Sequence, residues 1–242
     1  MDEDGAQGGL QSLDAALALL LRLAQAPSAQ SLSDLARAAG MPPSKAHRYL
    51  ASFAHAGLVR QAGRSGKYDL GPAALDLGLA ALARLDFVNR AADRLADLVA
   101  ETGLTALLCV WSENGPVVIR WERSSRHMVT ALGLGSTLPL LNSATGRVFL
   151  AFAPPALTAG RLAVEGGGGE ALRARTRADG YASVTGDLIP GLAAIAAPVL
   201  DWQGEAQASV TLIDTDPARA APESPALAAL LRFCKGLGVA AR

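Results

Sequence analysis

Five polar side chains in the segment 44–52 are of types that bind nucleic acid. At 100° per residue, a helix through this segment places Ser44, Lys45, His47, Arg48 and Ser52 on one side and apolar residues on the other. Lysine and arginine donate hydrogen bonds to guanine and to phosphates, and serine hydroxyls can bond to either. The spacing therefore predicts a helix that presents base-reading side chains to the major groove of DNA.

More cations follow in a short predicted hairpin. Arg60, Arg64 and Lys67 lie around its Gly-rich tip, where we expect them to meet phosphates or the adjacent minor groove. The segment 35–68 contains no acidic residue, so nothing in it repels phosphate. Basic residues on an outward face are also typical of a merely solvated surface, but here they coincide with a turn, an amphipathic helix and a hairpin.

Three helices must hold this face in place. Apolar residues dominate the segment 13–23, which predicts the first helix. Ser33 is suited to cap a short second helix that Gly40 closes. Pro42 suits the first turn of the third helix. We include Ser33 and Pro43, near the starts of the second and third helices, among the DNA-binding residues.

The remainder of the chain has a different pattern. Residues 1–9 are acidic and Gly-rich and are expected to be disordered, and residues 10–71 form a winged helix-turn-helix. A linker helix is expected over 72–88. Residues 89–242 form an α+β domain with helices over 89–102, 143–152, 170–179 and from 225, strands over 105–112, 117–123, 127–132, 194–200 and 206–213, and a mobile loop around 166–169.

One helix start in this second domain is suited to an anion. At Ser143, Ala144, Thr145 and Gly146, free N–H groups and the helix dipole favour a carboxylate, and the small residues let it approach the backbone. The alternative is that Ser143 is only an N-cap and Gly146 only a packing contact.

Both halves of the chain resemble one protein family. SLSDLARAAGMPPSKAHRYLASFAHAGLVRQ and GKYDLGPAALDLG are similar to the DNA-binding domain and linker of the IclR-type bacterial transcriptional regulators, and GSTLPLLNSATGRVFLAF and RADGYASVTGDLIPGLAAIAAPVLD resemble their effector-binding domain. The resemblance implies a GAF-like second domain, a homodimer or homotetramer, and repression or activation of transcription gated by a small-molecule effector. It also implies that Asp187, Leu192, Ala194, Ser209 and Thr211 contribute to the effector site.

The sequence departs from the family pattern at three positions. Arg147 replaces a usual lysine, Leu141 replaces a polar or aromatic residue, and Ala194 replaces a Cys or Ser. The site is therefore expected to be more apolar and to suit an aromatic or branched carboxylic acid. Trp111, Trp121, His127 and Met128 are further candidates for lining it, although an aromatic side chain in a strand more often belongs to the core.

The composition excludes several other classes of protein. The 242 residues carry 22 basic and 22 acidic side chains and are 50% hydrophobic, which is typical of a globular protein. No membrane span or secretory leader is expected, so the protein is expected to be cytoplasmic. Cys109 and Cys234 are expected to be reduced core thiols, and their spacing supports no metal site.

An enzyme is not expected. The Gly63–Lys67 segment lacks phosphate-loop spacing, and no GxSxG or HExxH motif occurs. No cofactor is expected either. The alternative function is a ligand-sensing or enzymatic α+β domain whose N-terminal helices serve only for assembly.

Overall fold

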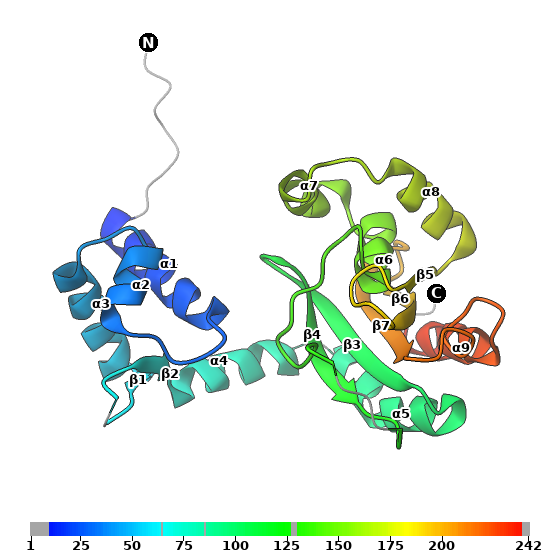
Figure 1. Ribbon diagram of the computed structural model, residues 1–242, viewed down its shortest axis with the longest axis horizontal. Coiled ribbons are helices and arrows are strands. Elements are labelled where there is room, and N and C mark those ends of the chain that lie inside the picture. The colour runs from blue at the N-terminus through cyan, green and yellow to red at the C-terminus, as the bar shows by residue number, and fades with distance from the viewer. Residues whose placement is uncertain (1–9, 64, 85, 127–129, 239–242) are drawn as a thin grey trace, which may run out of the picture. The chain divides into compact units, whose positions relative to one another are not determined.

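The computed structural model describes residues 10–63, 65–84, 86–126 and 130–238 (Figure 1). The chain forms two compact units, Met1–Arg84 and Leu85–Arg242. The expected disordered segment 1–9 lies outside the described residues.

The N-terminal unit is a small helical domain with a two-stranded wing. Its elements are α1 (Gln11–Gln25), α2 (Leu32–Ala38), α3 (Pro43–His55), β1 (Val59–Gln61), β2 (Tyr68–Leu70) and α4 (Pro72–Ala83). Buried apolar side chains from α1, α2, α3 and the wing form its core, among them Leu19, Leu35 and Leu50. β1 and β2 are antiparallel, and Gln30 adds an isolated bridge to Tyr68, which ties the wing to the segment before α2.

Three local expectations for this unit are corrected. The cap of α2 is Ser31, whose hydroxyl accepts a hydrogen bond from the Asp34 N–H at 3.2 Å, and not Ser33. Pro42 is the N-cap of α3, and Pro43 takes the first helical position instead. The linker helix α4 ends at Ala83 and α5 starts at Asp86, so residues 72–88 are not one helix. Gly40 ends α2 as expected, with a left-handed φ of 62°.

The C-terminal unit contains one antiparallel sheet in the order β4-β3-β7-β6-β5. Its strands are β3 (Thr105–Ser112), β4 (Gly115–Glu122), β5 (Ala182–Thr185), β6 (Ala193–Leu200) and β7 (Ala206–Asp214). Its helices are α5 (Asp86–Thr102), α6 (Ala144–Phe152), α7 (Pro155–Val164), α8 (Glu170–Asp179) and α9 (Pro225–Leu237). This is the expected α+β architecture.

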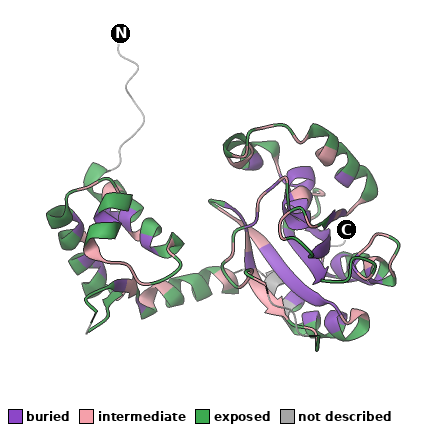
Figure 2. Cartoon of the chain, viewed as in Figure 1, coloured by how far each residue is buried: buried purple, intermediate pink, exposed green. Residues whose placement is uncertain are grey.

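Each face of the sheet buries its own core (Figure 2). On one face, α5 and α9 pack on residues such as Leu108 and Leu212. On the other face, α6 packs on residues such as Leu107 and Ile213. Because side chains alternate along a strand, neighbouring residues of β3 and β7 serve opposite cores.

Some elements of this unit were not expected from the sequence. Helix α7 lies between the expected helix 143–152 and the expected loop around 166–169, where no helix was predicted, and strand β5 was not predicted either. The strand expected over 127–132 is wrong for residues 130–132, and residues 127–129 lie outside the described part. Within the described part of the chain, no helix is long and apolar enough to cross a membrane.

Candidate nucleic-acid interface and ligand cavity

The outer face of α3 carries the side chains expected to read DNA. Ser44, Lys45, His47, Arg48 and Ser52 are all exposed, as is Pro43 at the start of the helix. The opposite face of α3 is anchored by the buried side chains of Ala46, Leu50 and Phe53. The helix is thus fixed to the core by one side, and its cations, free of ion pairs within the described residues, face solvent.

The wing presents fewer free cations than expected. Lys67 is exposed, but Arg60 donates to the Asp69 carboxylate at 3.0 Å across the two strands. The hydrogen bond from Arg60, followed by that from the Leu70 N–H, holds the pKa of Asp69 below its usual value. Arg64 lies outside the described residues, and Ser33 is exposed at the start of α2 with its hydroxyl 3.0 Å from that of Ser31.

A small cavity lies between α6 and the sheet. Six of the nine predicted effector-site residues line it: Ser143, Ala144, Thr145, Leu192, Ala194 and Thr211. The other lining residues are apolar: Leu107, Leu132, Leu138, Val184, Leu188, Ile189 and Ile213. The cavity leaves about 20 Å³ for water-sized molecules, which is room for about one water.

The N-terminus of α6 forms the polar end of this cavity. The Ser143 hydroxyl accepts from the Gly146 N–H at 2.8 Å and donates to the Pro139 carbonyl at 2.6 Å. The hydrogen bonds of the described residues leave the Ala144 and Thr145 amides without a partner. Gly146 does not line the cavity: a Cβ there would lie 2.0 Å from the Pro139 oxygen, so this glycine is a packing contact. Both the N-cap and the packing roles considered from sequence are therefore present.

Two hydroxyl groups meet where α6 faces the sheet. The Thr145 hydroxyl of α6 and the Thr211 hydroxyl of β7 are 2.6 Å apart, and both residues line the cavity. Ser209 is buried, and its hydroxyl lacks a partner within the described structure; it does not line the cavity. Burial raises the pKa of Cys109 to about 12, more than the Thr145 hydrogen bond lowers it. Cys109 and Cys234 are both free and buried, as expected.

Asp187 also lies outside the cavity lining. Its carboxylate accepts from the Arg147 Nη2 at 2.6 Å. Arg147 donates in addition to the Leu141 carbonyl through Nε at 2.8 Å and to the Ser183 carbonyl through Nη1 at 2.9 Å. Arg147, which stands where the family usually has a lysine, therefore joins α6 to β5 and to the segment that carries Asp187.

Glu165 is a residue that sequence reasoning missed. Its carboxylate accepts from the Leu140 N–H at 2.9 Å, from the Leu141 N–H at 3.1 Å and from the Arg161 Nε at 2.7 Å. These bonds fix the segment that leads into α6. Only the contact with Arg161, four residues earlier on α7, could have been found from spacing, because Glu165 directly follows that helix.

Trp111 and Trp121 are partly buried and pack against the core on the cavity side of the sheet, but neither lines the cavity itself. His127 and Met128 lie outside the described residues.

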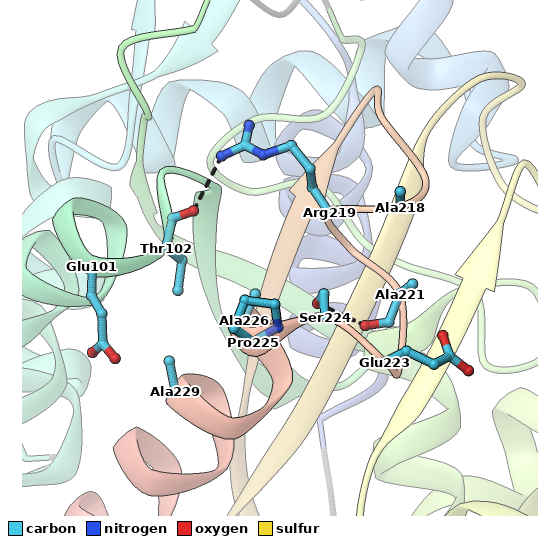
Figure 3. Close-up of a pocket in the computed structure, with 10 residues that line it drawn as sticks. All are labelled: Glu101, Thr102, Ala218, Arg219, Ala221, Glu223, Ser224, Pro225, Ala226 and Ala229. Carbon is cyan, nitrogen blue, oxygen red and sulfur yellow. Dashed lines mark hydrogen bonds between the residues drawn. The ribbon is translucent and has the colours of Figure 1, made fainter.

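A larger groove lies between the end of α5 and the start of α9 (Figure 3). It measures about 540 Å³ and has an alanine-rich lining with carboxylates at Glu101 and Glu223. Its one lining arginine, Arg219, donates to Asp214 at 2.7 Å and to the Thr102 carbonyl at 3.2 Å. Because that cation is already paired, the groove is poorly suited to a carboxylate ligand.

Comparison with known proteins agrees with both units. Residues 12–63 match the IclR helix-turn-helix domain, and residues 79–163 match the C-terminal domain of the bacterial transcriptional regulator IclR. The chain is 32% identical over 202 residues to the glycerol operon regulatory protein of Streptomyces griseus. The match covers 79% of this chain and 80% of that protein.

Two solved structures are similar over nearly the whole chain. Pseudomonas aeruginosa HmgR is 36% identical, has a TM-score of 0.58, and the match covers 94% of this chain and 96% of that one. An IclR homologue from Microbacterium hydrocarbonoxydans, complexed with 4-hydroxybenzoate, is 23% identical with a TM-score of 0.76, over 93% and 97% of the two chains.

The helix-turn-helix unit followed by an α+β unit defines a DNA-binding transcriptional regulator, a class of proteins that are not enzymes. The chain belongs to the IclR family of bacterial transcriptional regulators.

Proposed function

We propose that this protein is a cytoplasmic repressor or activator of transcription that binds a specific operator as a homodimer or homotetramer. A small carboxylic acid bound in the α6 cavity controls its binding to that operator. The observation that carries the proposal is the outer face of α3, where Lys45 and Arg48 are exposed and free of carboxylate partners among the described residues. A dimer would place two such helices in successive major grooves about 34 Å apart.

DNA binding is tested by selection from random duplex DNA at about 150 mM salt, followed by binding titrations on the enriched sequence. Wild type is expected to enrich a pseudo-palindrome, and Lys45→Ala/Arg48→Ala is expected to lose it. The matched control is Arg123→Ala/Lys235→Ala, which removes two exposed cations from the second unit. Equal loss in both variants would mean that net charge alone governs binding, and it would favour the alternative of a sensing domain with assembly helices.

Dimerisation is supported by an apolar surface on the N-terminal unit. Leu13, Leu17 and Leu21 form one exposed stripe along α1, and α4 buries none of its residues, leaving Leu75 and Leu79 at least half exposed. Exposed apolar side chains grouped on a helix in this way favour association. The occupant we propose is a second copy of this chain. Leu13→Glu/Leu17→Glu is expected to shift the mass in light scattering toward the monomer.

The cavity supports an effector with an apolar body and one carboxylate. Ten of its thirteen lining residues are alanine, valine, leucine or isoleucine, and the unpartnered Ala144 and Thr145 amides can receive the anion. The relative complexed with 4-hydroxybenzoate supports this class of ligand. Calorimetry is expected to show tighter binding of benzoate-type or branched acids than of glyoxylate or pyruvate, and the reverse order would refute this choice.

The control of DNA binding is proposed to be allosteric. Binding in the cavity changes the spacing of the two recognition helices of the dimer through the linker helix α4. A coupling free energy of about 1–3 kcal/mol would change operator affinity roughly five- to 150-fold. The test is to titrate operator with and without a bound acid, and the acid with and without operator, because the two coupling factors must be equal.

A further inference from the structure

The segment 138–143 contributes to one wall of the cavity and leads directly into α6. Its first and last residues, Leu138 and Ser143, both line the cavity. The segment belongs to no strand or helix, so no regular pattern of backbone hydrogen bonds fixes its path. Whatever fixes this path also sets where α6 begins and where the unpartnered Ala144 and Thr145 amides point.

Two side chains of the α6 region bond carbonyls of this segment. The Ser143 hydroxyl donates to the Pro139 carbonyl at 2.6 Å, and the Arg147 Nε donates to the Leu141 carbonyl at 2.8 Å. Ser143 is the N-cap of α6, and Arg147 is the fourth residue of that helix. Both bonds therefore tie the segment to α6 itself and not to the rest of the unit.

Glu165 binds the segment from outside α6. Its carboxylate accepts from the Leu140 N–H at 2.9 Å and from the Leu141 N–H at 3.1 Å. Glu165 is the C-cap of α7, and its side chain is only 14% exposed. Among the described residues, the other bond from outside α6 runs from the Leu138 N–H to the Pro116 carbonyl at 2.8 Å. Because the Glu165 bonds involve a charged acceptor and two consecutive amides, they fix the middle of the segment firmly.

Arg161 holds the Glu165 carboxylate in place. Its Nε donates to Glu165 Oε1 at 2.7 Å. The Arg161 side chain also runs beside the start of β4, since a Cβ at Gly115 would lie 3.6 Å from its Cγ. The guanidinium charge offsets that of Glu165, which would otherwise oppose a carboxylate ligand at the start of α6.

We propose that Glu165 is a positioning residue of the effector site. Without touching the ligand, it sets the path of the segment 138–143 and thereby the direction of the Ala144 and Thr145 amides. The inference rests on the proposed function for the ligand that these amides receive, but not for the effect on the segment. The competing explanation is that Glu165 only adds to the stability of the unit.

Calorimetry with benzoate on the full-length protein, well below its melting temperature, is the first test. Glu165→Ala is expected to weaken binding roughly tenfold, the lower end of what loss of an orienting group costs at metal sites. Glu165→Asp keeps the charge but is one methylene too short to reach both amides, and the same loss is expected. Glu165→Gln keeps one acceptor oxygen at full reach and is expected to lie between wild type and Glu165→Ala. The matched control is Glu170→Ala, which removes an exposed carboxylate five residues further along and is expected to bind like wild type.

Hydrogen exchange of the ligand-free protein is the second test. In Glu165→Ala, the Leu140 and Leu141 amides are expected to exchange roughly ten- to 100-fold faster, because each loses a hydrogen bond to a charged group. The Gly146 amide donates to the Ser143 hydroxyl at 2.8 Å and is expected to exchange faster as well, because the segment carries Ser143. Amides of β6 and β7 are expected to exchange as in wild type.

Three results would overturn the proposal. The first is a Glu165→Ala variant that binds benzoate as tightly as wild type while its melting temperature falls, since the residue would then serve stability alone. The second is wild-type binding by Glu165→Asp, which would show that the charge matters and the reach to both amides does not. The third is unchanged exchange of the Gly146 amide in Glu165→Ala. If benzoate does not bind wild type, the choice of ligand fails, and the exchange of Gly146 still decides whether Glu165 positions the start of α6.

Discussion

Replacing Gly146 by alanine tests whether this glycine serves packing. The added Cβ would lie 2.0 Å from the Pro139 oxygen and 2.5 Å from the Leu140 Cα, whereas real Cβ atoms keep at least 3.0 Å. The α6 helix and the 139–140 backbone must therefore separate by 3.0 minus 2.0, or about 1 Å. Overpacking of this kind costs about 1–3 kcal/mol. The Ser143–Pro139 hydrogen bond across the same contact adds about 1 kcal/mol when it is lost.

The higher helix propensity of alanine offsets about 1 kcal/mol of this cost, so the net loss of unfolding free energy is about 1–3 kcal/mol. At roughly 2–4 °C per kcal/mol for a unit of this size, the melting temperature in calorimetry is expected to fall by about 2–12 °C. The matched control is Gly160→Ala on α7, where a Cβ meets nothing within 4 Å; it is expected to stabilise by about 0.5–1 kcal/mol. A melting temperature for Gly146→Ala within about 1 °C of wild type would refute the packing argument.

Three further outcomes are expected. Ser31→Ala is expected to destabilise the N-terminal unit by about 1 kcal/mol in denaturant unfolding, because it removes the α2 cap, whereas Ser33→Ala is expected to be near neutral; the reverse order would contradict the cap assignment. Because the folded pKa of Asp69 is lowered, its contribution to stability is present above the ordinary value of 3.8 and is lost as pH falls through the folded pKa. The unfolding difference between wild type and Asp69→Asn is therefore expected to shrink below about pH 4, and a pH-independent difference would argue against the Arg60 pair. Cys109, whose pKa is raised to about 12, is expected to react with a thiol reagent at pH 8 only after unfolding, and rapid labelling of the native protein would show that the cavity face of the sheet opens.

The DNA-binding half was the more predictable from sequence, because its helices and turns are determined by residues close together in the chain. The apolar positions of α3 recur at helical spacing, and Gly40 supplies the left-handed residue that ends α2. The cap of α2 was assigned wrongly because two serines stand two residues apart, and either could cap a helix from its own position. Contacts with the wing and with α1 fix the residue at which α2 starts, and this start makes Ser31 the cap.

The second unit was less predictable because its site depends on contacts distant in sequence. The hydroxyl pair of Thr145 and Thr211 joins residues 66 apart, and the Arg147–Asp187 bond joins residues 40 apart. The family resemblance implied a ligand contact for Asp187, and only the fold shows its pairing with Arg147. Helix α7 was missed because a proline pair, a glycine and only one buried residue, Thr158, leave its sequence without a clear apolar face.

The thinness of the sheet has a consequence for signalling. Leu107 lines the cavity, and Leu108, the next residue of β3, belongs to the core under α5 and α9. Thr211 and Leu212 stand in the same relation on β7. A single layer of backbone thus separates a bound ligand from the packing beneath α5, the helix with which the chain enters this unit. If a ligand on one face displaces a strand by a fraction of an ångström, the packing of the side chains on the other face changes as well, because one backbone carries both sets. No chain of side-chain contacts is needed between the two faces.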